Sequence, residues 1–300
     1  MKTKRLLFST TALLVALSLA FTSCRKKEEK DKDTSGAEDN SLADKSFEDM
    51  GQIANEAASG NVSSFKDINN DGLLSVCATK THDTVNHIIV VDFGSSNCLC
   101  NDGRYRRGKI FVSYSNSVHP VPYSYWDSLT VITISTTKAG DPGSDTYFVG
   151  NDQSSMNQVI GTKNLTNRGH NAAQHMNWDV TVNGQVIKAN GQGTVQWQST
   201  RNREWLAGET IPNTTWSDDV YGVTGTATGT SANGTPFTVQ ITSQIIRKIS
   251  CPKHFVSGTL DFTPGSKPVR HVDFSPPNNG ACDNIATVTI NGNTYTVYMH

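Results

Sequence analysis

The stretch DVTVNGQVIKANGQGTVQWQST, from Asp179 to Thr200, decides the fold class of this chain. Apolar and polar residues alternate on both sides of a centre rich in Gly and Asn, which is the pattern of a hairpin in a half-buried sheet. The alternation places Val180 and Val182 on one face and their threonine neighbours on the other. The stretch therefore predicts antiparallel strands with a core face and a threonine-rich solvent face.

Comparable runs rich in Val, Ile, Thr, Tyr and Phe follow one another after Asn61, separated by short polar stretches with Gly, Asn, Asp or Pro. Asn and Gly tolerate the positive φ of a two-residue hairpin turn, so an Asn-Gly pair between two such runs predicts antiparallel neighbours. Such pairs begin at Asn183, Asn190, Asn233 and Asn291. The chain is therefore predicted to be all-β, an antiparallel meander that forms either a sandwich or an extended curved sheet.

The run STRNREWLAG, Ser199–Gly208, applies the same alternation to charged residues. It places Arg201, Arg203 and Trp205 on one face of the sheet. Two arginines beside a tryptophan either stack on a ligand or lay their stems over the ring as a cation–π cluster. We favour the structural cluster.

The first residues of the chain have the features of an export signal. A basic cluster is followed by an apolar stretch that ends at Phe21 and then by FTSC, which ends at Cys24. A small residue directly before a cysteine resembles the lipobox of bacterial lipoproteins. The resemblance implies cleavage before Cys24 and lipidation of its side chain.

The remainder divides by composition. The charged and small residues of RKKEEKDKDTSGAEDN cannot bury apolar surface, so the lipidated cysteine and a disordered tether are placed at 24–40, after a signal peptide at 1–23. An apolar stripe with Gly60 at its end predicts one short amphipathic helix at 41–61. A β-rich ectodomain follows at 62–300, with candidate halves at 62–165 and 166–300.

Two similar stretches in these halves each carry a cysteine after a Val-Asp-Phe strand. They are VDFGSSNCLC, at Val91–Cys100, and VDFSPPNNGAC, at Val272–Cys282. Cys77 precedes the first stretch and Cys251 precedes the second. We interpret them as two related β units, each of which links a loop to a neighbouring strand.

In an exported, oxidising setting such cysteines form lasting disulfides. The predicted pairs are Cys251 with Cys282, and Cys77 with either Cys98 or Cys100. Asn-Asp follows Cys100 as Asp-Asn follows Cys282, which slightly favours Cys100. The Cys-x-Cys spacing also suits zinc or copper, but the histidines show no ligand spacing, so no firm metal site is predicted.

A weak calcium-like loop begins at Asp67. Asp67, Asn69 and Asp71 stand at the first ligand positions of a calcium loop, ahead of a glycine. The twelfth position is Ala78, where a bidentate carboxylate is needed. Calcium is thus the single cofactor that the sequence suggests, and a plain polar turn is the competing interpretation.

Several aromatic residues lie in segments whose composition is typical of loops. Exposed rings on a β scaffold form stacking platforms for sugars, whereas some tryptophans of a large sheet must fill its core. Trp197 lies in an alternating run and is assigned to the core. The candidates for a ligand-facing patch are Tyr123, Tyr125, Trp126 and Trp216.

Signs of catalysis are few, so no catalytic residue is assigned and a non-enzyme is favoured. The chain has no Gly-x-Ser-x-Gly elbow and no glycine-rich phosphate loop. A carboxylate pair for glycoside hydrolysis has only four candidates: Asp218, Asp219, Glu204 and Glu209. The formal net charge of -1, with no basic run beyond the signal and tether, argues against nucleic acid as a partner.

Several stretches resemble a family of uncharacterised Bacteroidota lipoproteins: QSTRNREWLAG, DDVYGVTGTATGTSANGTPFTVQIT, SGTLDFTPG and CDNIATVTINGNTYTV. The resemblance implies a β-rich domain anchored by lipid in the outer membrane, at the cell surface or on the periplasmic face, and brings no agreed activity. We expect a non-catalytic binding or structural module of the envelope, whose partner is a polysaccharide or an envelope protein. The alternatives are a glycan-binding accessory lipoprotein and a secreted hydrolase.

Overall fold

The structure, a computed structural model, describes residues 30–59, 74–115, 131–138, 147–209, 218–251, 254–276 and 281–299. The chain divides into two units, Met1–Lys32 and Asp33–His300, and every element described below belongs to the second. The predicted signal segment and Cys24 lie outside the described residues.

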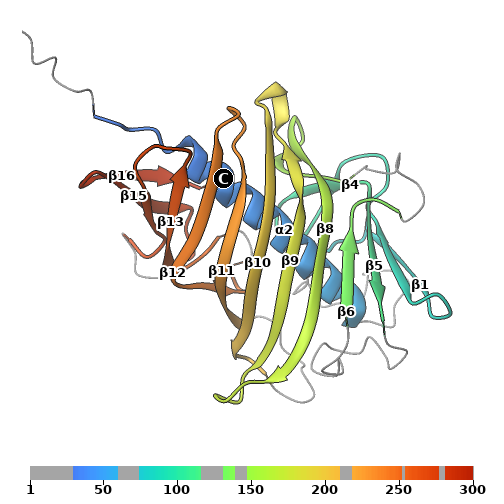
Figure 1. Ribbon diagram of the computed structural model, residues 1–300. Coiled ribbons are helices and arrows are strands. Elements are labelled where there is room, and N and C mark those ends of the chain that lie inside the picture. The colour runs from blue at the N-terminus through green and yellow to red at the C-terminus, as the bar shows by residue number, and fades with distance from the viewer. Residues whose placement is uncertain are drawn as a thin grey trace, which may run out of the picture. The chain divides into compact units, whose positions relative to one another are not determined.

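The strands of the described part have the following bounds: β1 Thr79–Asp83, β2 Ile88–Asp92, β3 Cys98–Leu99, β4 Tyr105–Arg107, β5 Lys109–Tyr114, β6 Val131–Ser135, β7 Phe148–Asp152, β8 Ser155–His170, β9 Met176–Ile187, β10 Thr194–Ala207, β11 Val220–Thr230, β12 Pro236–Lys248, β13 Ser257–Pro264, β14 Arg270–Asp273, β15 Ile285–Ile290 and β16 Asn293–Tyr298. They form one 16-stranded antiparallel sheet (Figure 1). From β8 onward each strand pairs with the next one along the chain, and β3, β4 and β7 form a side branch that joins β8.

The all-β prediction and the antiparallel meander are confirmed. The choice between a sandwich and an extended sheet is also answered, because the strands form a single open sheet with β1 and β16 at its ends. The candidate boundary at 165/166 falls inside β8, so the segments on either side of it share one continuous sheet.

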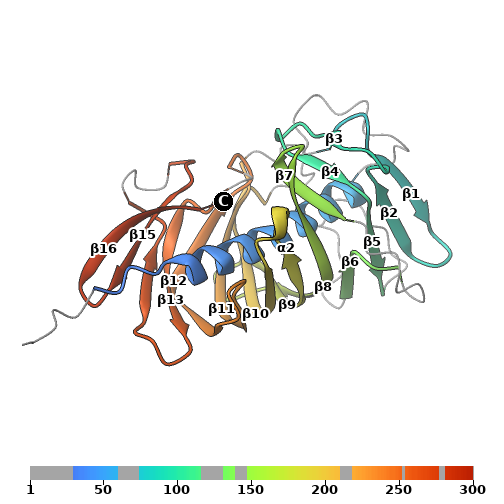
Figure 2. The same cartoon turned by 90° about the horizontal axis from the view of Figure 1, so that it is seen from above.

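Within the described residues one long helix, α2 (Ser35–Ser59), packs on one side of the sheet, which is called the inner face below. Figure 2 shows α2 running along the inner side of the curved sheet. The alternation predicted for Val180 and Val182 is confirmed, since both are buried, and Val288 and Ile290 of β15 are buried in the same way. The opposite side, the outer face, carries their exposed and half-exposed neighbours.

The helix begins at Ser35 rather than at Ser41, so residues 35–40 of the predicted tether are helical. Its first turn has local partners: the Asp33 carboxylate accepts from the Ser35 N–H at 3.2 Å, and the Thr34 hydroxyl donates to Glu38 at 2.7 Å. At the other end, Lys80 Nζ donates to the Ala57 carbonyl at 2.9 Å. A cation at this end also complements the helix dipole.

The apolar stripe of α2 packs on a part of the sheet where two paired glycines leave room for its side chains. Phe47 stacks on Trp197 with 5.7 Å between ring centroids, above the paired residues Gly161 and Gly184. A Cβ atom on Gly184 would lie 2.4 Å from Phe47 Cζ. The prediction of a turn at Asn183-Gly184 is therefore wrong: this pair lies inside β9, and its glycine makes room for a helix side chain.

The other Asn-Gly pairs lie in turns as predicted. Asn190 has a φ of 56° and belongs to the short 3-10 turn η4 (Ala189–Gly191) that joins β9 to β10. Asn233 lies between β11 and β12, where Gly234 has a φ of 84°. Asn291 has a φ of 48° in the β15–β16 hairpin.

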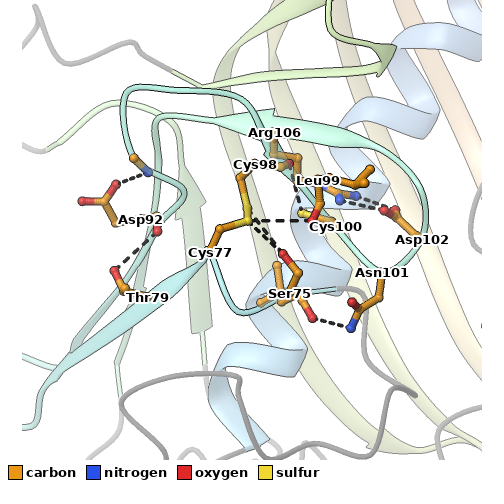
Figure 3. Close-up of a disulfide and its surroundings, with 12 residues drawn as sticks. Ser75, Cys77, Thr79, Asp92, Cys98, Leu99, Cys100, Asn101, Asp102 and Arg106 are labelled. Atoms are coloured by element: carbon orange, nitrogen blue, oxygen red, sulfur yellow. Dashed lines mark hydrogen bonds and ion pairs between the residues drawn. A yellow bond between two sulfur atoms is a disulfide. The ribbon is translucent and has the colours of Figure 1, made fainter.

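The predicted Cys251–Cys282 disulfide is confirmed, and of the two alternatives for Cys77 the structure has the bond to Cys98. Cys251 is bonded to Cys282, with Cα atoms 5.4 Å apart. Cys77 is bonded to Cys98, with Cα atoms 5.8 Å apart, and Cys100 is a buried free thiol (Figure 3).

The preference for Cys100 was wrong because this residue starts a tight turn. The Cys100 N–H donates to the Arg104 carbonyl at 2.8 Å, and the Cys100 carbonyl accepts from the Gly103 N–H at 2.9 Å. The Cys100 thiol interacts with Arg106. Cys98 instead faces the segment that carries Cys77, and the Ser75 hydroxyl lies 3.5 Å from its sulfur.

Candidate functional site

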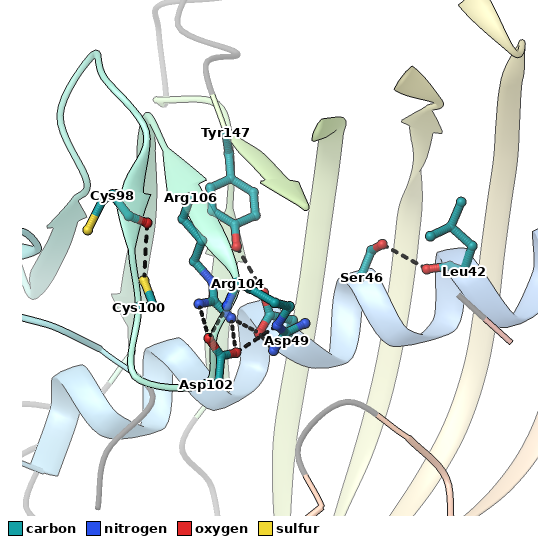
Figure 4. Close-up of polar contacts among 9 residues, drawn as sticks. All are labelled: Leu42, Ser46, Asp49, Cys98, Cys100, Asp102, Arg104, Arg106 and Tyr147. Atoms are coloured by element: carbon teal, nitrogen blue, oxygen red, sulfur yellow. Dashed lines mark hydrogen bonds and ion pairs between the residues drawn. The ribbon is translucent and has the colours of Figure 1, made fainter. Parts of the chain in front are cut away.

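Ion pairs are buried where α2 meets the side branch of the sheet (Figure 4). Asp49 Oδ1 lies 2.6 Å from Arg104 Nη2 and 2.7 Å from Arg106 Nη2, and the Tyr147 hydroxyl donates to Asp49 Oδ2 at 2.9 Å. Asp102 Oδ2 lies 2.7 Å from Arg106 Nη2. Burial raises the pKa of Asp49, but the two guanidinium charges outweigh it and lower the pKa below the ordinary value. Asp49 is therefore an ionised anchor of the helix.

A second buried group lies further along the inner face. Lys163 Nζ lies 2.5 Å from Glu48 Oε2, and Arg203 Nη1 lies 3.5 Å from Glu48 Oε1. The Arg203 guanidinium also lies 3.7 Å from the centroid of the Tyr221 ring. Burial lowers the pKa of Lys163. Burial alone would raise the pKa of Glu48, but the charges of Lys163 and Arg203 lower it below its ordinary value.

These contacts agree with the structural interpretation of Arg201, Arg203 and Trp205. All of them are buried on the inner face, and Arg201 Nη2 lies 3.2 Å from Asp44 Oδ2 of the helix. The cavity beside them measures about 20 Å³. That volume holds about one water molecule, so this network fixes the helix and leaves no room for a ligand.

A larger pocket of about 430 Å³ lies beside the N-terminal half of α2 and is called the α2 pocket below. Its helix wall carries Lys45 and Ser46. Arg104, Lys188 beside η4 and His254 after β12 form part of the remaining wall. Strand β7 and the start of β8 form the rest, with Val149, Gly150, Asn151, Asp152, Ser155 and Asn157. Its size falls within the range of small-molecule sites.

Lys45 is the most unusual group in the α2 pocket. Its side chain is buried, with 9% of the residue exposed, and its Nζ lies 3.3 Å from His254 Nδ1. Burial, together with the charges of Arg247 and Arg104, lowers the pKa of Lys45 to about 7. Near neutral pH the amine is therefore present in both the charged and the neutral form.

The other charges of the α2 pocket have partners of their own. Lys188 Nζ lies 2.7 Å from Asp39 Oδ1, and Glu38 accepts from the Thr34 hydroxyl. The Ser46 hydroxyl donates to the Leu42 carbonyl of the helix at 2.7 Å (Figure 4). The charges of Arg247 and Arg104 lower the pKa of Lys45, so an anion placed beside its amine is favoured, although Asp49 and Asp102 already pair with Arg104.

The outer face carries a regular polar array. Cross-strand pairing aligns Thr181, Thr200 and Thr226 in one row. The row continues over the sheet as Ser113, Thr133, Asn164, Thr181, Thr200, Thr226, Gln240, Asp261, His271, Thr289 and Thr294. A shallow depression lies over its middle, and the described side chains that line the depression include no charged or aromatic group.

The carboxylates proposed for hydrolysis are occupied by other contacts. Glu204 Oε1 accepts from Asn171 at 2.7 Å and from His175 at 2.9 Å, and Glu204 Oε2 accepts from Gln244 at 3.1 Å. The Asn171 hydrogen bond, followed by that from His175, lowers the pKa of Glu204. A general acid needs a raised pKa, so Glu204 is unsuited to that role.

The other candidates of that set lie in different environments. Asp219 is buried below Gly208 and accepts from the Tyr221 hydroxyl at 3.2 Å, whereas Asp218 is exposed. Glu209 Oε1 lies 2.8 Å from His170 Nε2.

The remaining predicted site residues lie outside the described part of the chain: Asp67, Asn69, Asp71, Tyr123, Tyr125, Trp126 and Trp216. The assignment of Trp197 to the core is confirmed, and Trp178 and Trp205 are buried as well. Within the described ranges, no cluster of His, Cys, Asp and Glu side chains has a geometry that holds a metal ion. No helix in the described part of the chain is both long enough and apolar enough to cross a membrane.

Sequence reasoning missed Lys45 and His254. Lys45 stands four residues before Asp49 on the polar side of the helix, and the inner-face positions of the strands carry basic residues that require acidic partners on α2. This pattern predicts a buried polar side of α2, although it gives no indication of His254. Comparisons of the chain with protein-family models, with curated proteins and with solved structures find no match.

Proposed function

We propose that this protein is a lipid-anchored, non-catalytic binding module of the bacterial envelope that holds a small anionic ligand in the α2 pocket. The location rests on the signal-like first residues and on the lipobox-like sequence that ends at Cys24. The binding role rests on one observation: a buried lysine and an arginine line a pocket of about 430 Å³.

The reason is the cost of the buried charge. Burial and the charges of Arg247 and Arg104 disfavour the ammonium form of Lys45, so an opposite charge added close to it is favourable. A ligand carboxylate or phosphate in the α2 pocket adds such a charge beside Lys45. Binding is then linked to proton uptake by Lys45, which strengthens the attraction for the anion.

Thermal denaturation of the purified protein with increasing oxalate or inorganic phosphate tests this function. A ligand that binds the native state alone stabilises it by about 2.7 kcal/mol at a hundred times its dissociation constant. We expect a dose-dependent rise in Tm that is lost in Lys45→Met and kept in Lys109→Met, which changes an exposed lysine of β5. A flat response to both anions, or a response that persists in Lys45→Met, would show that the proposal is wrong.

The outer face supports a second candidate function, the binding of a neutral glycan. Hydroxyl and amide groups in register across the sheet offer donors and acceptors without charge. Electrophoresis in gels that contain a neutral polysaccharide tests this: a retarded protein should regain its mobility when Thr200→Lys places a long charged side chain in the row. Equal mobility in gels with and without each polymer would exclude this function for those polymers.

A further inference from the structure

We infer that Lys45 captures a small carbonyl compound that carries a carboxylate, and that it does so as a reversible imine in the α2 pocket. The inference deepens the proposed function and rests on it, because it names the ligand class as small oxo acids. It adds a covalent step that simple anion binding does not require.

The first support is the position of the amine. Lys45 is on the helix wall of the α2 pocket, and its side chain is buried although the pocket is large enough for a small molecule. A carbonyl compound in the pocket is thus held beside Lys45. Holding both groups in one pocket raises the effective concentration of the amine.

The second support is the charge around the amine. Arg247 and Arg104 are the charged groups that act on Lys45, and with burial they bring its pKa to about 7. Lysines that react with carbonyl groups are activated in this way, by desolvation or by neighbouring cations. The same cations attract a carboxylate placed next to the carbonyl group, and Arg104 lines the pocket.

The third support is a proton carrier at the reacting atom. His254 Nδ1 lies 3.3 Å from Lys45 Nζ, close enough to exchange protons with it. Histidine is the residue that most often acts as a general acid or base in proteins.

The reaction balances without a further reagent. The Nζ lone pair of the neutral amine attacks the carbonyl carbon, the C–N bond forms, and a proton moves from nitrogen to the former carbonyl oxygen to give a carbinolamine. His254 in its protonated form then donates a proton to the hydroxyl group, which leaves as water, and the nitrogen lone pair forms the C=N bond of the protonated imine. Attack of water on that carbon reverses the sequence and releases the ligand.

Reductive trapping tests the inference. The purified protein is incubated with glyoxylate and cyanoborohydride, and the adduct is located by intact mass and peptide mapping. We expect one dominant carboxymethyl adduct on Lys45, absent in Lys45→Arg and unchanged in Lys109→Arg. His254→Asn should slow its formation by at least about tenfold.

The outcomes separate the two proposals. If oxalate raises the Tm but glyoxylate gives no adduct on Lys45, the imine is wrong and anion binding stands. If oxalate has no effect and no adduct forms, both are wrong. An adduct spread evenly over exposed lysines also overturns the imine, because it shows that Lys45 has no special reactivity.

Discussion

Asp49 Oδ1 of α2 lies 2.7 Å from Arg106 Nη2 of β4, and neither side chain has any exposed surface. A buried ion pair of this kind is seldom a net gain in stability, but the loss of one partner leaves an uncompensated charge in the core. Asp49 therefore determines where along the sheet the helix lies. It also holds Arg104, which lines the α2 pocket, at 2.6 Å.

Replacement of Asp49 should destabilise the protein strongly. Asp49→Ala leaves the buried charges of Arg104 and Arg106 with Asp102 as their one remaining carboxylate, and we expect a loss of about 3–5 kcal/mol in the free energy of unfolding. Urea denaturation followed by circular dichroism measures this loss. Asp218→Ala, which changes an exposed carboxylate before β11, serves as the control and should leave the midpoint nearly unchanged. Equal effects of the two substitutions would contradict the role given to Asp49.

The cysteine pairing is open to direct chemical proof. Non-reducing peptide mapping should recover Cys77 joined to Cys98 and Cys251 joined to Cys282. Cys100 should resist alkylation in the native protein and react after unfolding, because it is buried and burial raises the pKa of its thiol. A native protein that contains a Cys77–Cys100 bond would refute this pairing.

Gly184 should tolerate no side chain while Phe47 is present. A Cβ atom there meets Phe47 Cζ and the Ile160 carbonyl oxygen, each at 2.4 Å. We expect Gly184→Ala to cost about 1–3 kcal/mol in unfolding free energy. In the Phe47→Ala background the added cost of Gly184→Ala should be smaller, since the ring is gone and only the backbone contact remains. Full additivity of the two changes would show that they do not interact.

The strands could be predicted from the sequence because alternation is a local property of the chain. Val180 and Val182 are buried as their spacing indicates, and the same spacing places Arg201 and Arg203 on the inner face. The first turns of α2 could not be predicted in this way. Asp39 and other residues there are polar, and their burial depends on distant partners such as Lys188, 2.7 Å from Asp39.

The candidate site was unpredictable for the same reason. Lys45 and His254 lie 209 residues apart in the chain and meet only because β12 ends beside the N-terminal half of α2. Neither residue belongs to a local motif. The wrong preference for Cys100 over Cys98 has another cause. The two cysteines have nearly the same sequence context, and they differ in backbone geometry, because Cys100 starts a tight turn.

Lys45 should give the stability of the protein a recognisable dependence on pH. Its pKa in the folded state is about 7, whereas a lysine in the unfolded chain has a pKa of about 10.4. Between these values the unfolded state binds more protons, so the free energy of unfolding rises as the pH rises from about 7 to about 10. Below this window both states are protonated, and the cost of the buried charge, on the order of a few kcal/mol, is fully present.

Lys45→Met should therefore be more stable than the parent protein at pH 7, and the difference should shrink towards pH 10. Urea denaturation of both proteins at a series of pH values measures this difference, which isolates Lys45 because Lys163 and Lys80 are retained in both. A difference that stays constant over the window would show that Lys45 keeps an ordinary pKa, and the α2 pocket would then hold no neutral amine at physiological pH.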